Sequence, residues 1–123
     1  MEFIGICLIT KNVMALTEFY CKVLNVEFEG DSSHTDIKTK GAGISIFSIE
    51  GMEDMAPNST VGAGYGSFTI SFKVDNVDKE YERLKLMGVE FVKHPKTYKW
   101  GSRSFWFRDP DGNIINFMSI INN

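Results

Sequence analysis

The sequence has few cysteines, no long apolar run and no basic leader. Cys7 and Cys21 lie in a strand-like and a helix-like segment. Without a second pair they indicate neither a disulfide framework nor a zinc site, and we expect both to be reduced core residues. No apolar run approaches the ~18 residues that a membrane helix needs, and no basic stretch precedes an apolar one at the N-terminus. We therefore expect a cytoplasmic protein that does not bind membranes.

An excess of basic charge is also missing. The formal net charge is −3, and Lys and Arg do not cluster, so the sequence lacks the electrostatic footprint that DNA or RNA binding requires. The 123 residues, 43% of them hydrophobic, suffice for one core but are short for two independent domains. We expect a single domain spanning residues 1–123.

Hydrophobic periodicity divides the first part of the chain into five elements. The apolar run 3–10 predicts a buried strand. Asn12 is suited to cap a helix over residues 13–24, where apolar residues recur every three or four positions. Three further strands are predicted at 26–28, 34–40 and 44–49. The order is β-α-β-β-β.

The second part repeats this order. A strand is predicted at 68–74, a helix at 77–87 and an extended segment at 89–92, followed by a loop over residues 94–101. Residues 104–120 then predict a β-hairpin, because the segment Asp109-Pro110-Asp111-Gly112 between two apolar runs is typical of a turn.

The two halves are related in sequence. Asn12-Val13 matches Asn76-Val77 at an offset of 64, and the Val-Glu-Phe that begins at Val26 matches the one at Val89 at an offset of 63. This predicts two repeats, about 1–50 and 67–121, joined by a Gly-rich linker. We expect an α+β fold in which two tandem β-α-β-β-β units form a cupped, partly open eight-stranded mixed sheet. The helices would cover its convex side, and a ligand would bind in its concave side.

Three segments point to a known family: FYCKVL at residues 19–24, YERLKLMGV at 81–89 and FRDPDGN at 107–113. Together with the duplication they resemble the glyoxalase I, bleomycin-resistance and extradiol dioxygenase superfamily, also called vicinal oxygen chelate proteins. The resemblance covers nearly the whole chain and implies the same fold. It does not fix the activity, because this scaffold supports unrelated chemistries.

The resemblance also implies where a metal would bind. In the metal enzymes of the superfamily, inward-facing residues of matching strands, usually His and Glu, hold a divalent ion. The corresponding positions here are Gly5, Thr69, Asn116 and either Ser45 or Phe47. None offers an imidazole or a carboxylate, so we predict that the metal site is lost and that no metal cofactor is needed.

Other metal ligands are weakly indicated. His34 and His94 lie in polar edge or loop segments and are interpreted as surface residues. Glu50, Glu53 and Asp54 could form a site in the linker, although an acidic run in a Gly-rich loop is usually solvated.

Strand alternation predicts an inner face that is mostly apolar with a few hydroxyl and amide groups, the composition of a small-molecule pocket. The inner face comprises Gly5, Cys7, Ile9, Ser45, Phe47, Thr69, Ser71, Ser104, Trp106, Asn116 and Met118. The predicted ligand-binding residues are Cys7, Phe47, Thr69, Ser71, Trp100, Arg103, Trp106, Asn116 and Met118. Tyr65 is also expected to stack on a flat ring, whereas Arg103 could pair an anionic group or only cap a turn.

The function predicted is metal-independent binding of a small, partly aromatic organic molecule by a homodimer. The resemblance to the bleomycin-resistance branch implies sequestration of a drug or metabolite, although the predicted pocket has no carboxylate for a cationic drug. One alternative is a metal-dependent lyase or dioxygenase with a non-standard site. Another is a structural or interaction domain that uses its outer helices, although the charged residues at 79–85 are interpreted as a solvated helix face. Catalysis by Cys7 would need a stabilised thiolate, and no histidine is predicted nearby.

Overall fold

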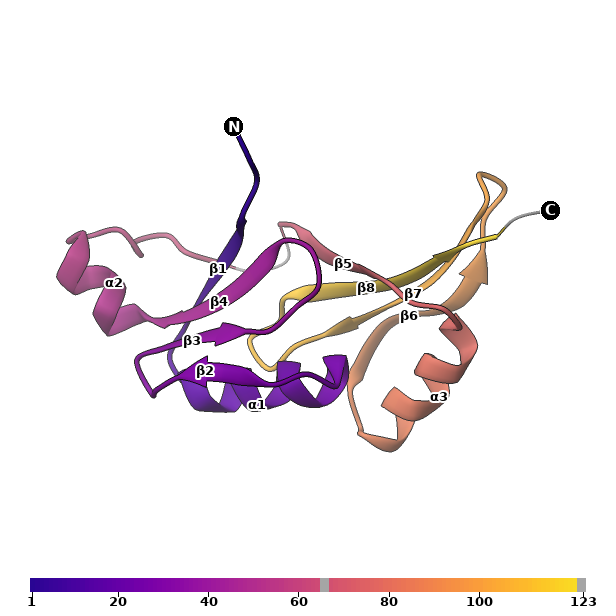
Figure 1. The fold of residues 1–123 in the computed structure, drawn as a ribbon, viewed down its shortest axis with the longest axis horizontal. Coiled ribbons are helices and arrows are strands. Elements are labelled where there is room, and N and C mark those ends of the chain that lie inside the picture. The colour runs from indigo at the N-terminus through magenta and orange to yellow at the C-terminus, as the bar shows by residue number, and fades with distance from the viewer. Residues whose placement is uncertain (65–66, 122–123) are drawn as a thin grey trace. The chain divides into compact units, whose positions relative to one another are not determined.

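The computed structural model describes residues 1–64 and 67–121, and in these it contains eight strands and three helices (Figure 1). It consists of two compact units, Met1–Ala63 and Gly64–Asn123. None of the helices in the described part is long and apolar enough to cross a membrane.

The first unit has one sheet and two helices. Its sheet has the order β1-β4-β3-β2, with β1 parallel to β4 and the other pairs antiparallel. The elements are β1 (Gly5–Thr10), α1 (Val13–Leu24), β2 (Phe28–Gly30), β3 (His34–Ile37), β4 (Gly43–Ser48) and α2 (Ile49–Met55).

The second unit repeats this topology with the order β5-β8-β7-β6, in which β5 runs parallel to β8. Its elements are β5 (Thr69–Lys73), α3 (Val77–Leu86), β6 (Glu90–Thr97), β7 (Ser102–Arg108) and β8 (Ile114–Ile120). The predicted α+β fold with a repeated β-α-β-β-β order is thus confirmed, as eight strands in two mixed four-stranded sheets.

Helix α1 begins and ends at two asparagines. The side chain of Asn12 accepts a hydrogen bond from the backbone N–H of Ala15, and Asn25 adopts the left-handed conformation, with φ of 59°, that commonly ends a helix. Asn76 caps α3 in the same way by accepting from the N–H of Lys79. The cap predicted at Asn12 is thus confirmed, and α3 starts with the same type of contact.

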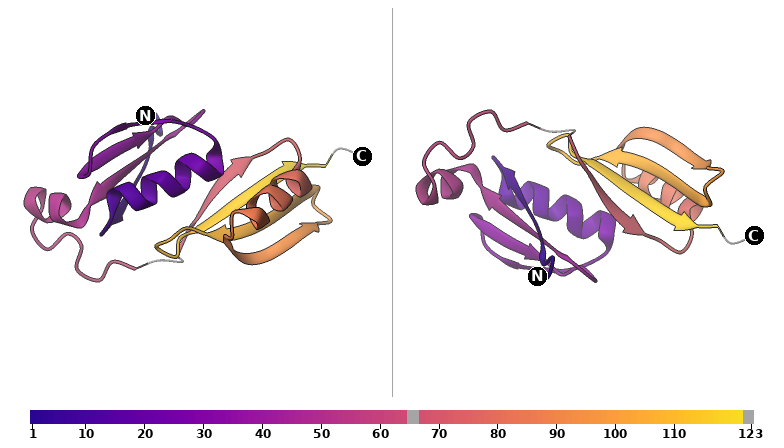
Figure 2. Two further views of the ribbon diagram at one scale, coloured as in Figure 1. Left: turned by 90° about the horizontal axis from the view of Figure 1, so that it is seen from below. Right: turned by 90° about the horizontal axis from the view of Figure 1, so that it is seen from above.

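One face of each sheet is buried against a helix of its own unit, α1 in the first and α3 in the second (Figure 2). The short helix α2 contacts β4 and β1, and its Gly51 lies next to the ring of Phe47. In the first unit the strand residues Leu8 and Ile46 and the α1 residue Leu16 are almost fully buried. In the second unit the strand residues Phe105, Phe107 and Ile115 and the α3 residue Leu84 are fully buried. Because side chains alternate along a strand, the residues between these positions lie on the face opposite α1 or α3. We call this the open face of each sheet.

Three expectations were wrong. The segment that begins at Glu50 is not purely a linker, because α2 covers residues 49–55; the side chain of Ser48 accepts a hydrogen bond from the N–H of Gly51 and caps this helix. Residues 94–97 belong to β6 rather than to a loop. Cys7 is exposed, because it lies on the open face and not in the core.

Candidate functional site

The open face of the second sheet brings together most of the predicted ligand-binding residues. Pairing register places Ser71 of β5 beside Asn116 of β8, and Asn116 beside Trp106 of β7. In the next row Met118 pairs with Ser104. One open face therefore presents an indole, a thioether and several hydroxyl and amide groups.

Asn116 occupies the centre of this face. Its Nδ2 donates to the hydroxyl oxygen of Ser71 over 3.1 Å. Its Oδ1 is buried and accepts no hydrogen bond from the residues that the structure describes, which is costly for an amide. Thr69 shares the face but pairs with Ile114, so the neighbour of Asn116 on β5 is Ser71.

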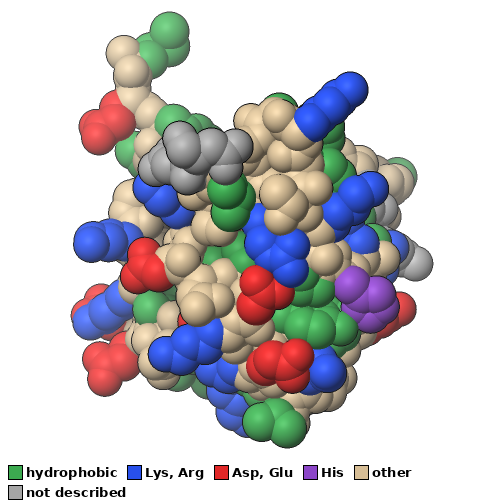
Figure 3. All heavy atoms as spheres, turned by 90° about the vertical axis from the view of Figure 1, so that its right-hand side faces the viewer, with side chains coloured by type: hydrophobic (Ala, Val, Ile, Leu, Met, Phe, Trp, Pro, Cys, Tyr) green, Lys and Arg blue, Asp and Glu red, His purple; other side chains and the backbone are tan. Residues whose placement is uncertain are grey.

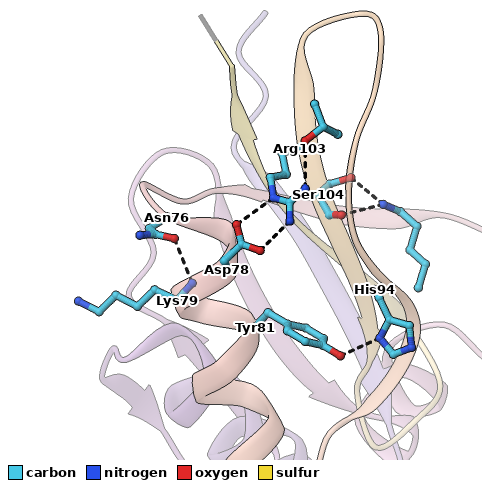
Figure 4. Close-up of polar contacts among 9 residues, drawn as sticks. Asn76, Asp78, Lys79, Tyr81, His94, Arg103 and Ser104 are labelled. Atoms are coloured by element: carbon cyan, nitrogen blue, oxygen red, sulfur yellow. Dashed lines mark hydrogen bonds and ion pairs between the residues drawn. The ribbon is translucent and has the colours of Figure 1, made fainter.

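A lysine that we did not predict also lies on this face. The register of β6 shifts between Phe91 and Lys93, and the shift places Lys93 opposite Trp106. The Nζ of Lys93 donates to the backbone carbonyl oxygen of Ser104 over 3.0 Å and to its hydroxyl oxygen over 2.8 Å (Figure 4). A β-bulge of this kind re-aims side chains relative to strict alternation, which explains why the pattern did not reveal it.

Aromatic rings surround the Lys93 ammonium. Its Nζ lies 5.2 Å from the ring centroid of Trp106 and 4.8 Å from that of Tyr98, within the range of a cation–π contact. Tyr98 also has Lys96 at 5.2 Å and is stacked on Trp100 with centroids 4.5 Å apart. Trp100 is 70% exposed, so this predicted ligand-binding residue lies at the solvent end of the cluster.

Arg103 lies on the opposite, helix-covered face of the same sheet. Its Nε and Nη2 donate to the two carboxylate oxygens of Asp78 at the start of α3, over 2.9 and 2.7 Å, and its Nη1 donates to Thr97 (Figure 4). The hydrogen bonds from Arg103 hold the pKa of Asp78 below its usual range. The guanidinium therefore connects a helix to the sheet, and does not share a face with Trp106.

The first unit presents its own set of open-face residues. Cys7 pairs with Ser45, and Ile9 with Phe47. The ring of His34, itself exposed, lies 5.5 Å from that of Phe47. Cys7 and Phe47 thus share a face within this unit. The other cysteine, Cys21, is half-buried, and burial raises the pKa of its thiol, so it is not an activated nucleophile.

The residues at the positions implied by the superfamily do not fit a divalent metal. Gly5 has no side chain, Thr69 offers a neutral hydroxyl, and the Nδ2 of Asn116 already donates to a neighbouring hydroxyl. Among the described residues, no three His, Cys, Asp or Glu side chains lie close enough together to hold a metal ion. Tight sites for transition metals require imidazole, thiolate or carboxylate ligands.

One of the acidic residues that follow β4, Glu53, has a structural role. The carboxylate of Glu53 accepts hydrogen bonds from the N–H groups of Asn58 and Thr60 and from the Thr60 hydroxyl, over 2.6 to 2.9 Å, and these bonds lower the pKa of Glu53. Glu53 therefore fixes the loop after α2. Tyr65, expected to stack on a ligand, lies outside the described residues.

Comparison with models of protein families shows to which family the chain belongs. The model of the glyoxalase/bleomycin resistance protein/dioxygenase superfamily matches residues 4–117. The chain belongs to this superfamily, as its sequence segments predicted.

The chain is also similar to individual proteins over nearly its whole length. YraH of Bacillus subtilis (strain 168) is 28% identical over 128 residues, which cover 98% of this chain and all of that protein. A glyoxalase/bleomycin resistance protein/dioxygenase family enzyme from Burkholderia phytofirmans PsJN superimposes with a TM-score of 0.88 at 18% identity, covering 98% of this chain and 100% of that one. A glyoxalase/bleomycin resistance protein/dioxygenase from Nocardioides superimposes with a TM-score of 0.82 at 21% identity, covering 100% of this chain and 85% of that one. At these identities the solved structures show the fold alone.

Proposed function

We propose that the protein binds a small, partly aromatic organic molecule without a metal ion, and so sequesters a drug or metabolite. The observation that carries the proposal is the row Ser71, Asn116 and Trp106 on the open face of the second sheet. A ring supplies apolar contact, and neighbouring hydroxyl and amide groups supply orientation, which is the usual division of roles in a ligand site.

The donor set argues against the superfamily's metal chemistry in this chain. Glyoxalase and extradiol dioxygenase reactions need a Lewis acid that chelates paired oxygens. Gly5, Thr69 and Asn116 provide neither imidazole nor carboxylate at the positions where such an ion would be held. We therefore propose binding rather than turnover of a hemithioacetal or a catechol.

Affinity should come from apolar area on Trp106 and Met118. About 200 Å² of buried apolar ligand surface contributes roughly 5 kcal/mol at ~25 cal/mol per Å². The entropy of association has to be subtracted from this value. We expect a dissociation constant in the micromolar range or weaker.

The experiment is an isothermal titration of EDTA-treated protein with 2-naphthamide, a neutral aromatic probe. We expect saturable binding that Trp106→Ala weakens about tenfold, because a buried aromatic contact is lost. Trp100→Ala is the matched control and should change the dissociation constant less than about twofold, since Trp100 is mostly exposed. Equal effects of the two changes would contradict the proposed site.

A parallel assay tests the absence of metal chemistry. Protein dialysed against Ni²⁺, Zn²⁺, Mn²⁺ and Fe²⁺ should retain no stoichiometric metal and should not turn over a hemithioacetal or a catechol. Stoichiometric metal together with turnover of either substrate would refute the proposal.

We also propose that the protein acts as a homodimer. Strand β1 ends its sheet, and the residues before it, Phe3 and Ile4, are 71% and 80% exposed. Unpaired strand edges and adjoining apolar residues favour association with another chain. Sedimentation of a 13.9 kDa species at micromolar concentration would rule the dimer out.

A further inference from the structure

We propose that the ligand of this open face is a small aromatic anion, and that the Lys93 ammonium binds its carboxylate, sulfonate or phosphate group. This inference rests on the proposed function, because it concerns the same face and names the chemical class of the ligand. Three observations carry it: the hydrogen bonds of Lys93, its contacts with the rings of Tyr98 and Trp106, and the charges on the open face of β5, β6, β7 and β8.

Lys93 is held in place before any ligand arrives. An ammonium has three N–H protons, and two of them are directed at the carbonyl and hydroxyl oxygens of Ser104, over 3.0 and 2.8 Å. Both acceptors are neutral, so these bonds position the positive charge without neutralising it. One proton remains to donate to a ligand oxygen, and a donor fixed in advance loses little entropy on binding.

The ammonium and the aromatic surface adjoin each other. Nζ lies 5.2 Å from the Trp106 centroid and 4.8 Å from the Tyr98 centroid. A flat ring in contact with Trp106 would therefore bring a directly attached acidic group within reach of Lys93. This geometry favours a compact aryl acid, in which ring and charge are one or two bonds apart.

The charge of this sheet has one sign over most of its open face. By register and alternation the open face carries Lys73, Lys93, Lys96 and Arg108. The structure describes every residue of β5, β6, β7 and β8, and among these only Glu90 is acidic. Glu90 pairs with Arg108, where β6 begins and β7 ends.

This contrasts with the net charge of −3 for the whole chain and with the interspersed charges of both signs on the face drawn in Figure 3. An excess of positive charge on this face of an otherwise acidic protein raises the local concentration of anions. A cationic ligand would be repelled by the same three lysines.

The test is an isothermal titration of the metal-free protein at low ionic strength with three probes that share one ring system: 2-naphthoate, 2-naphthamide and 2-naphthylmethylammonium. The anion should bind about tenfold more tightly than the neutral amide, as expected for a hydrogen bond to a charged group. The cation should bind more weakly than the amide. Added salt should weaken binding of the anion more than that of the amide.

Variants of Lys93 test whether this residue causes the preference for the anion. Lys93→Met keeps nearly the length of the side chain and removes its charge, and should abolish the preference for 2-naphthoate over 2-naphthamide. Lys93→Arg should retain the preference. The matched control Lys99→Met removes an exposed charge from the following turn and should leave the preference intact.

The outcomes separate the inference from the proposed function. Equal affinities for anion and amide, or tighter binding of the cation, would overturn the anion assignment while the aromatic binding face stands. Binding of none of the three probes would refute both. If Lys93→Met does not fold, the probe series and the salt dependence of the unaltered protein still decide the charge of the ligand.

Discussion

The turn between β7 and β8 should depend on one buried carboxylate. Asp109 is 5% exposed. Its Oδ1 accepts hydrogen bonds from the backbone N–H groups of Asp111 and Asn113, each over 2.9 Å, and its Oδ2 accepts from the side-chain Nδ2 of Asn113 over 2.8 Å. Asp109→Ala would leave these donors without their acceptor.

The expected cost follows from these contacts. A hydrogen bond to a charged group contributes about 1.5 to 3 kcal/mol, and bonds that share one acceptor are not additive. We expect Asp109→Ala to lower the free energy of unfolding by about 3 kcal/mol. For a chain of this size the midpoint of thermal unfolding should fall by roughly 10 °C.

Urea unfolding followed by circular dichroism measures this change, with Asp111→Ala as the matched control. Asp111 is the exposed carboxylate of the same turn, and its loss should change the free energy of unfolding by less than about 0.5 kcal/mol. Asp109→Asn keeps one carbonyl oxygen and should cost about half as much as Asp109→Ala. A cost below about 1 kcal/mol for Asp109→Ala would refute this account of the turn.

Three further predictions concern buried hydroxyls, pH and metal. The hydroxyl oxygens of Thr17 and Thr35 lie 2.7 Å apart and are fully buried, so Thr17→Val should cost about 1 to 2 kcal/mol in urea unfolding, and adding Thr35→Val should not add an equal cost. Because the pKa of Asp78 is lowered in the folded state, its ion pair with Arg103 stabilises the fold above about pH 4, and this stabilisation is lost as the pH falls through the lowered pKa. Arg103→Met should therefore lower the free energy of unfolding by under about 1 kcal/mol at pH 7 and by progressively less in acid. EDTA or added Ni²⁺ should not shift the thermal midpoint, because a metal that bound the native state would raise it.

The sequence predicted helix ends correctly where a single residue sets the conformation at the end. The capping side chain of Asn12 and the left-handed Asn25 bound α1 at the predicted residues. Helix α2 was missed because Gly51 and the acidic residues around it obscure any apolar periodicity. Its one usable signal was the capping side chain of Ser48.

The candidate site was predictable only where strands alternate regularly. Trp106, Asn116 and Met118 share the face that alternation assigned to them. Lys93 was missed because the predicted extended segment ended at residue 92, and because the register shifts of β6, next to which Pro95 lies, break the two-residue period. The ion pair of Arg103 depends on Asp78, which lies 25 residues away in the chain, so no local pattern could reveal it.

The central claim, that an aromatic ligand binds the open face of the second sheet without metal, is tested most directly by NMR chemical-shift mapping of EDTA-treated protein titrated with 2-naphthoate. We predict that the largest shifts occur at the Trp106 indole N–H, the Asn116 side-chain amide and the backbone amide of Lys93, with little change along α3. Shifts confined to the helices, or shifts that appear only after a divalent metal is added, would contradict the account.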